Sequence, residues 1–187
     1  MISTNKAIKA SGALFLTAMV SSLVGGGLIE TANEQLLLIA GVILEMFNAI
    51  SVMGIGILLF PVLKRVWKSA AIGYLGFRMV EALVCLSAAL LPLLALTNGT
   101  ELRAFHTGTL IPLFFCGGAL IFYTVLFKYQ LLPRFISIWG WAGVLLIIYL
   151  NVYQPQGELV LLFALPIILN EFFLGVWLIR KGISIRS

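Results

Sequence analysis

Six long apolar stretches, separated by short polar breaks, make up most of the chain. They cover residues 10–28, 36–63, 69–96, 107–127, 135–153 and 159–179. About 20 residues of helix cross the ~30 Å hydrocarbon core of a bilayer, so each stretch is long enough to span a membrane. A small β-barrel would instead show alternating segments of about ten residues. The pattern therefore predicts an all-α, polytopic membrane protein, a bundle of six transmembrane helices.

The composition agrees with a lipid environment. Of the 187 residues, 61% are hydrophobic and 10% are charged, whereas soluble domains carry about 25% charged residues. A soluble fold is excluded, and the lipid bilayer is the first expected partner. The longest polar break, residues 97–106, is too short for a soluble domain, so residues 1–187 are predicted to form a single transmembrane domain. The first stretch is expected to stay in the protein, because its apolar run exceeds that of a signal peptide and no clear cleavage site follows.

Basic and acidic residues fall on opposite sides of the predicted membrane. The acidic side carries Glu30, Glu34, Glu101 and Glu158 with a single base, Arg103. Cytoplasmic loops are enriched in Lys and Arg, so both termini are predicted to be cytoplasmic. The net charge of +5 thus reflects orientation, and nucleic acid is not expected as a partner, because no basic stripe with interleaved aromatic residues occurs. The other side carries ten bases and no acid: Lys6, Lys9, Lys64, Arg65, Lys68, Lys128, Arg134, Arg180, Lys181 and Arg186.

Several ionisable and amide side chains lie inside the predicted spans, close to the membrane midplane. A charged residue there opposes insertion by about 2.5–3.5 kcal/mol, so these side chains are expected to face the bundle interior. Their spacing puts Arg78 and Glu81 on one face of a helix. One guanidinium cannot neutralise three carboxylates, so at least one glutamate is expected to be protonated near neutral pH or to bind a cation. The candidate site comprises Arg78, Glu81, Glu171, Glu45, Asn48 and Asn170.

Two functions fit this cluster. In a small carrier or channel it binds a proton, a cation or a small polar solute, because ionisable residues in membranes mark transport pathways. In a sensor, an assembly factor or a partner subunit that does not transport, the same cluster holds helices together. Enzymatic activity is not expected, nor a metal or other cofactor, since the chain has one histidine, no aspartate and no nucleophile–base motif. A second copy of the chain or another membrane protein stays open as a partner.

Prolines and cysteines add two smaller predictions. Pro92, Pro112 and Pro166 lie in the halves of their spans that are distant from the basic side. Each can kink its helix and free a carbonyl, which either opens a hydrated vestibule or is satisfied by neighbouring helices. Cys85 and Cys116 lie in apolar surroundings and are predicted to be free thiols.

The chain resembles one known protein family. The resemblance extends from Lys9 to Ile183, and it is carried by the strings GYLGFRMVE (73–81), LIFY (120–123), LPRFISIWG (132–140), LNE (169–171) and WLIRKG (177–182). These strings are similar to motifs of an uncharacterised family of bacterial six-helix membrane proteins, classified as a domain of unknown function. The resemblance implies a bacterial cytoplasmic (inner) membrane and carries over no activity.

Overall fold

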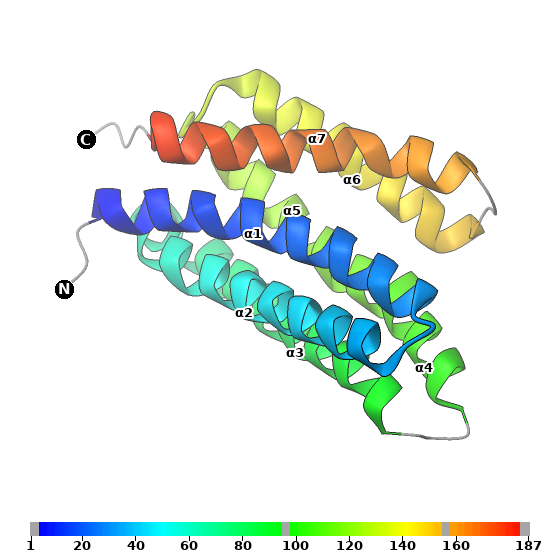
Figure 1. The fold of residues 1–187 in the computed structure, drawn as a ribbon. Coiled ribbons are helices and arrows are strands. Elements are labelled where there is room, and N and C mark those ends of the chain that lie inside the picture. Colours follow the sequence, from blue (N-terminus) through cyan, green and yellow to red (C-terminus); the bar gives the residue numbers. More distant parts are fainter. Residues whose placement is uncertain (1–3, 95–97, 155–157, 184–187) are drawn as a thin grey trace.

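The computed structural model describes residues 4–94, 98–154 and 158–183, and every element in these ranges is helical (Figure 1). Six segments of this part of the chain are long and apolar enough to cross a membrane. The predicted all-α fold with six spans is therefore confirmed. The helices are α1 (Thr4–Thr31), α2 (Gln35–Val66), α3 (Lys68–Leu90), α4 (Gly99–Phe105), α5 (Ile111–Lys128), α6 (Arg134–Tyr153) and α7 (Glu158–Arg180), with the 3₁₀ turn η1 (Leu91–Leu93) and the π-helical segment η2 (His106–Leu110).

The third and fourth spans differ from their predicted bounds. The third helix ends at Leu90 rather than at residue 96, and residues 95–97 lie outside the described residues. The fourth span begins at Gly99 rather than at residue 107, because α4, η2 and α5 follow one another without a break. Glu101 and Arg103 lower the hydropathy of its first turns, so the hydropathy pattern predicts a loop where the structure has a helix.

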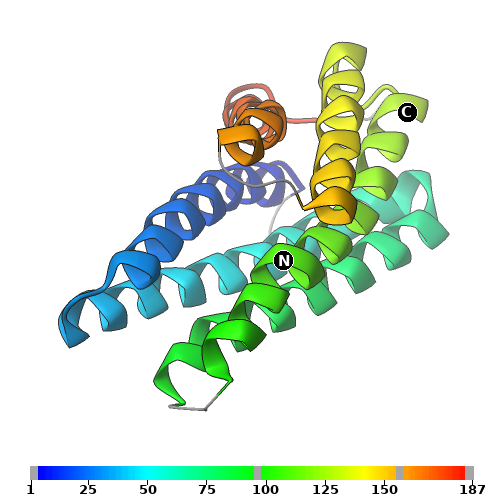
Figure 2. The ribbon, with the colours of Figure 1, turned by 90° about the vertical axis from the view of Figure 1, so that its right-hand side faces the viewer.

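The six spans form a ring in which each packs against two neighbours. The order around the ring is α1, α2, α3, α5, α6 and α7, and α7 returns to pack against α1. The start of α1 and the end of α7 lie at one end of the bundle, which we call the terminal end. The opposite end, where α4 lies, is the α4 end (Figure 1). Seen from the α4 end, the α1–α2 pair diverges from the α6–α7 pair (Figure 2).

Close packing fills the terminal half of the ring. The ring of Tyr74 stacks on Phe122 with centroids 5.1 Å apart, and Phe122 in turn stacks on Phe15 at 6.3 Å. Aliphatic side chains fill the space between these rings and the terminal end, so this half of the bundle is sealed. Those with no exposed surface are Leu59, Val62, Leu63, Ala71, Val125, Leu126, Ile136, Leu174 and Leu178.

Two glycines close the ring where α1 crosses α7. A Cβ atom on Gly12 would lie 2.6 Å from the carbonyl oxygen of Gly175 and 2.9 Å from Cβ of Leu178. Small residues let membrane helices approach closely, and association there depends on van der Waals packing. A side chain at either glycine would therefore separate the first span from the last.

Pro112 and Asn151 shape the α4 end. Pro112 has no N–H, so the carbonyl of Gly108, four residues earlier, loses its usual helical donor. The side-chain amide of Asn151 on α6 donates to the oxygens of Gly108 and Thr109, at 3.3 and 2.9 Å. The neighbouring helix thus satisfies carbonyls in the π-helical segment. In the same half of the bundle Cys85 is a free thiol, as is Cys116, as predicted.

The close contact at Gly12 predicts that Gly12→Ala lowers the free energy of unfolding by about 1–3 kcal/mol, the usual cost of overpacking. Denaturation in mixed micelles, followed by helical circular dichroism, measures it. Gly27→Ala is the matched control, because nothing lies within 4 Å of a Cβ at that exposed position. We expect that variant to be neutral or more stable by up to ~1 kcal/mol. Equal stability of the two variants would contradict the proposed role of the glycine contact in closing the ring.

Candidate intramembrane site

Arg78 and Glu81 form a salt bridge on one face of α3. Nη1 of Arg78 donates to both carboxylate oxygens of Glu81, at 3.1 and 3.0 Å. Its Nε donates to the hydroxyl oxygen of Tyr74, one turn earlier, at 3.2 Å. Each charged side chain is only 4% exposed. The pair lies inside the bundle, where the three-residue spacing and the cost of charge in lipid place it.

Aromatic rings surround the Arg78 guanidinium. Its Cζ lies 5.7 Å from the ring centre of Phe15, 5.5 Å from that of Tyr74 and 5.6 Å from that of Phe115, which come from α1, α3 and α5. A cation over an aromatic face is stabilised by about 0.5–2 kcal/mol. On α2, Gly56 leaves room for the arginine, since a Cβ there would lie 2.9 Å from Cβ of Arg78. Four helices therefore hold this one side chain.

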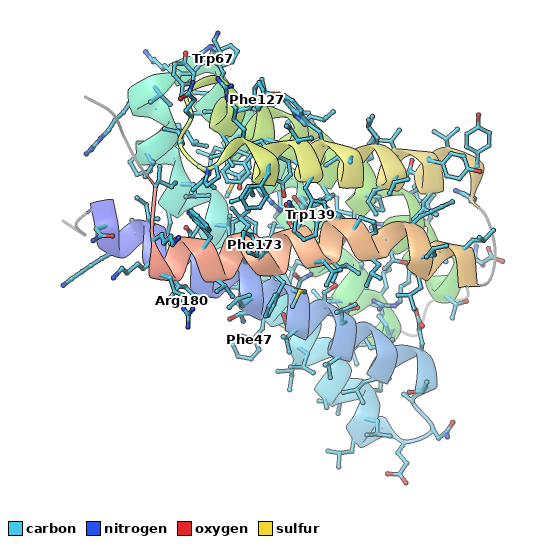
Figure 3. The ribbon with its side chains drawn as sticks, turned by 90° about the horizontal axis from the view of Figure 1, so that it is seen from above. Phe47, Trp67, Phe127, Trp139, Phe173 and Arg180 are labelled. Atoms are coloured by element: carbon cyan, nitrogen blue, oxygen red, sulfur yellow. The ribbon has the colours of Figure 1, made fainter. Side chains whose placement is uncertain are left out.

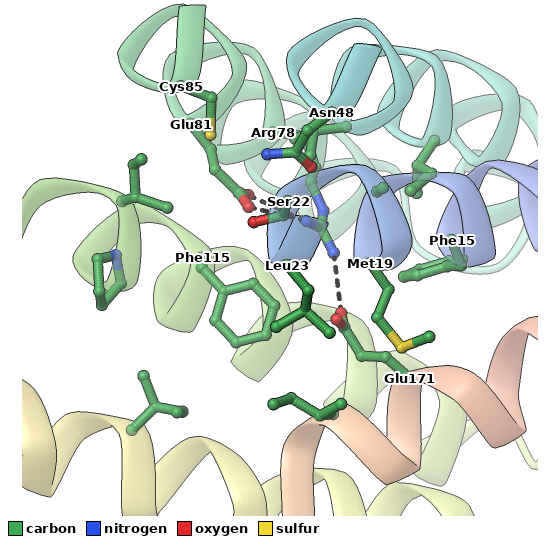
Figure 4. A pocket seen from close by; sticks show the side chains of 17 residues that line it. Phe15, Met19, Ser22, Leu23, Asn48, Arg78, Glu81, Cys85, Phe115 and Glu171 are labelled. Atoms are coloured by element: carbon green, nitrogen blue, oxygen red, sulfur yellow. Dashed lines mark hydrogen bonds and ion pairs between the residues drawn. The ribbon is translucent and has the colours of Figure 1, made fainter. Parts of the chain in front are cut away.

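Glu171 on α7 faces the same guanidinium from across the bundle (Figure 4). Its Oε1 lies 3.9 Å from Nη2 of Arg78, beyond hydrogen-bonding distance. The Glu171 side chain is 22% exposed, in contrast to the fully enclosed Glu81. Two carboxyl groups thus share one guanidinium that Glu81 already engages. With both ionised, the local formal charge is minus one.

Glu45 does not join this cluster, which corrects the prediction of three glutamates around Arg78. Its carboxylate accepts from both Nη atoms of Arg103 at 2.7 and 2.6 Å, and Nη1 also donates to the carbonyl of Ala88 at 2.7 Å. Arg103 was expected in a polar loop, but α4 turns it back between α2 and α3, where its side chain is 11% exposed. The predicted local excess of two negative charges is therefore reduced to one.

The two predicted amides have different surroundings. Asn170 is completely buried, accepts a hydrogen bond from the Tyr123 hydroxyl at 2.6 Å and donates to the carbonyl of Ile136 at 3.0 Å. It joins α5, α6 and α7 and does not line the cavity. Asn48 on α2 is half-buried and does line it, close to Arg78 (Figure 4).

A cavity of about 240 Å³ lies between these groups, and all six spans contribute to its wall. Most of the wall is apolar, with Met19, Ile55 and Phe115 among its residues. Among the described residues, no group of three or more His, Cys, Asp or Glu side chains is arranged to hold a metal ion. The polar or ionisable part of the wall consists of Ser22, Asn48, Arg78, Glu81, Cys85 and Glu171.

A second cavity of about 610 Å³ lies between η2, α6 and α7 at the α4 end. Its polar lining includes Thr107, Thr109 and Asn151. The two cavities share Pro112 and Ile147 as lining residues, so they adjoin each other. The site is therefore approached from the α4 end, whereas the packed aliphatic core closes it on the terminal side.

Some residues of the site were not predicted from the sequence. One sequence pattern could have placed Arg103 on a helix. Asn98 followed by Glu101 has the spacing of a helix-capping box, which indicates that a helix begins before the arginine. Tyr74 could have been found because it lies one helical turn before Arg78. Phe15 and Phe115 come from distant spans, and no local pattern places them near the guanidinium.

Comparison with known proteins identifies the family. A family model described as a domain of unknown function (DUF4386) matches residues 10–182, which include five of the six spans in full, the first span from residue 10 onward and every residue of the candidate site. No curated protein and no solved structure matches the chain. The resemblance seen in the sequence motifs is thus confirmed at the level of the family. The chain belongs to the DUF4386 family, a domain of unknown function.

Proposed function

We propose that this protein is a small carrier or channel that binds a proton, a cation or a small polar solute beside Arg78, Glu81 and Glu171. The observation that carries the proposal is the position of Glu171. Its carboxyl group lies at the cavity, 3.9 Å from a guanidinium that already donates two hydrogen bonds to Glu81. An excess carboxylate at this depth is a group that a proton or a cation would neutralise.

The charge balance favours a positively charged ligand over an anion. One arginine faces two glutamates, so an anion would add to an existing excess of negative charge. Asn48 and Ser22 offer an amide and a hydroxyl to a polar solute or to its hydration water. No enzymatic activity and no cofactor form part of the proposal.

The dimensions of the cavity fit a small ligand. A water molecule occupies roughly 30 Å³ of liquid volume, so the cavity of about 240 Å³ has room for several waters or one small solute. The adjoining cavity at the α4 end offers a polar route toward it. The stacked rings of Tyr74 and Phe122 lie between the cavity and the terminal end. Transport by a carrier then requires these rings to move as the α4 end closes.

We further propose that the protein lies in a bacterial cytoplasmic membrane with the terminal end facing the cytoplasm. The terminal end carries basic residues, among them Lys64, Lys128 and Arg134, while the exposed acids Glu30 and Glu101 lie at the α4 end. An excess of Lys and Arg marks the cytoplasmic side of membrane proteins. In this orientation the cavity opens away from the cytoplasm, and its ligand enters from outside the cell.

A second candidate function is a sensor, assembly factor or partner subunit that does not transport. The closely packed terminal half favours it, because Phe15 in the cavity wall stacks on Phe122, which in turn stacks on Tyr74, and these rings are buried. The enclosed Arg78–Glu81 pair would then hold the ring together, and truncating one partner of a buried pair typically costs 3–5 kcal/mol. Flux measurements separate the two functions.

For the carrier, we expect Glu171→Gln to reduce ligand-driven charge movement by about tenfold or more, equivalent to losing about 1.4 kcal/mol of cation binding. The measurement is solid-supported membrane electrophysiology on proteoliposomes, with concentration jumps of H⁺, Na⁺, K⁺ and ammonium. Glu30→Gln is the matched control, because it makes the same chemical change at an exposed residue outside the cavity.

Thermal unfolding in detergent first establishes that both variants are folded. A current to at least one cation, kept in Glu30→Gln and lost in Glu171→Gln, supports the carrier. Wild-type protein that is silent to all four cations argues against a proton or one of these cations as the ligand, and equal currents in the two variants argue against Glu171 as the group that binds it.

The two native cysteines test whether the cavity holds water. Cys85 lines the cavity, whereas Cys116 is equally buried outside it, with its thiol directed at the carbonyl of Val144 at 3.9 Å. The thiolate, which forms in contact with water, attacks thiosulfonate reagents and displaces their sulfinate group. We expect 2-aminoethyl methanethiosulfonate to modify Cys116→Ala, which retains Cys85, about tenfold faster than Cys85→Ala. Mass spectrometry of intact protein follows the reaction, and equal rates would indicate a dry cavity.

A further inference from the structure

A second polar groove lies at the terminal end, remote from the intramembrane site. It has a volume of about 600 Å³ and runs between the α5–α6 connection and the end of α7. We call it the terminal groove. Its lining residues are Gln130, Leu131, Leu132, Pro133, Arg134, Trp177, Lys181 and Gly182.

Two cations face the terminal groove from opposite sides. Arg134 begins α6 and Lys181 follows the last residue of α7, and both side chains are exposed. Neither forms a salt bridge with a carboxylate of the described residues. Each lies over an aromatic ring instead: Arg134 is 5.5 Å from Phe127, and Lys181 is 4.3 Å from Trp177. The rings position the two cations and leave their donors available to an anion.

The backbone of the groove favours negative charge as well. Helix α6 begins directly after Pro133 without a side-chain cap, and the first turn of a helix presents free N–H groups and a partial positive charge. At the other wall, the N–H groups of Lys181 and Gly182 donate to the carbonyl of Trp177, at 2.8 and 3.2 Å. That carbonyl at the end of α7 is thus occupied. The first turn of α6 therefore suits an anion, whereas at the end of α7 the positive charge comes from the side chain of Lys181.

An aromatic strip continues from the groove toward the membrane interior. Phe173 lies 5.9 Å from Trp177, and the same ring is 5.7 Å from Phe135 and 6.2 Å from Trp139. Phe135 is 50% exposed, so the strip is open to lipid. Figure 3 shows Phe173 beside Trp139, with Arg180 farther along toward the terminal end. A headgroup in the groove would have its acyl chains against this strip.

We propose that the terminal groove is a binding site for an anionic phospholipid, whose phosphate lies between Arg134 and Lys181 and whose acyl chains cover Phe135 and Phe173. Basic pockets between membrane helices are typical sites for anionic headgroups, and tryptophan favours the membrane interface. The aromatic strip favours a lipid over a free phosphate or an acidic protein segment, since neither of these has acyl chains. The site is independent of any ligand in the central cavity.

The bound lipid joins two parts of the ring that are distant in the sequence. The start of α6 and the end of α7 bear the cations, and the same helices are joined farther inside by the hydrogen bond from Asn170 to the carbonyl of Ile136. A phosphate between Arg134 and Lys181 adds a second link between them at the membrane surface. We therefore expect anionic lipid to raise the melting temperature of the full-length protein.

The test compares the binding of two phospholipids to the protein in a nonionic detergent. Native mass spectrometry measures binding, and thermal shift measures the change in melting temperature. Phosphatidylglycerol should bind and stabilise wild-type protein, whereas phosphatidylcholine should not. A charge near the membrane surface contributes about 1 kcal/mol, roughly a fivefold factor, so the double variant Arg134→Gln/Lys181→Gln should bind phosphatidylglycerol about 30-fold more weakly. The matched control is Lys64→Gln/Lys68→Gln, which removes two bases from the same end outside the groove and should stay within about twofold of wild type.

Further variants and ligands distinguish the source of the anion and control for misfolding of the Gln double variant. The conservative double variant Arg134→Lys/Lys181→Arg keeps both charges and should retain binding. If inorganic phosphate or a polyglutamate peptide raises the melting temperature as much as phosphatidylglycerol does, the proposal is overturned in favour of a free anion or an acidic protein. An equal loss in both Gln double variants, or no preference for phosphatidylglycerol over phosphatidylcholine, would overturn it as well.

Discussion

The guanidinium of Arg78, held inside a membrane bundle, is the constraint on which the arrangement of the site depends. A permanent positive charge at this depth is stable only where other groups replace its hydration. Glu81 and Tyr74 supply oxygen acceptors from its own helix, while Phe15 and Phe115 supply ring faces from α1 and α5. Glu171 closes the shell from α7. The ring of six spans brings these contributors to one point.

Some charged residues within the ring hold helices together, and another is available for binding. Glu45 and Arg103 neutralise each other near the α4 end, and both oxygens of Glu81 are engaged by Arg78. These contacts fix helices in place. Glu171 alone of the three glutamates combines a distant counter-ion with a position at the cavity, so the exchange of a proton or a cation that we propose would involve this one carboxyl group.

Local sequence rules predicted the spans and the Arg78–Glu81 pair, because hydropathy and helical spacing are properties of a single segment. The partner of Glu45 lies 58 residues away in the chain, and only packing brings the two together. Asn170 and Glu171 show a different limit. Consecutive residues point about 100° apart on a helix, so one side chain enters a contact with Tyr123 while the next faces the cavity. The rotation of α7 about its axis, which decides between them, is set by tertiary contacts such as that of Gly175 with Gly12.

Closure of the ring between α1 and α7 has a consequence for how the protein is made. The first described span, α1, leaves the ribosome before the other five, but α7, its neighbour across Gly12, follows all of them in the chain. Until α7 inserts, the guanidinium of Arg78 lacks Glu171, and the part of the cavity wall that α7 contributes does not exist. A nascent chain therefore carries the neutral Arg78–Glu81 pair through the insertion of the earlier spans, and the cavity and its excess carboxylate are completed only by α7.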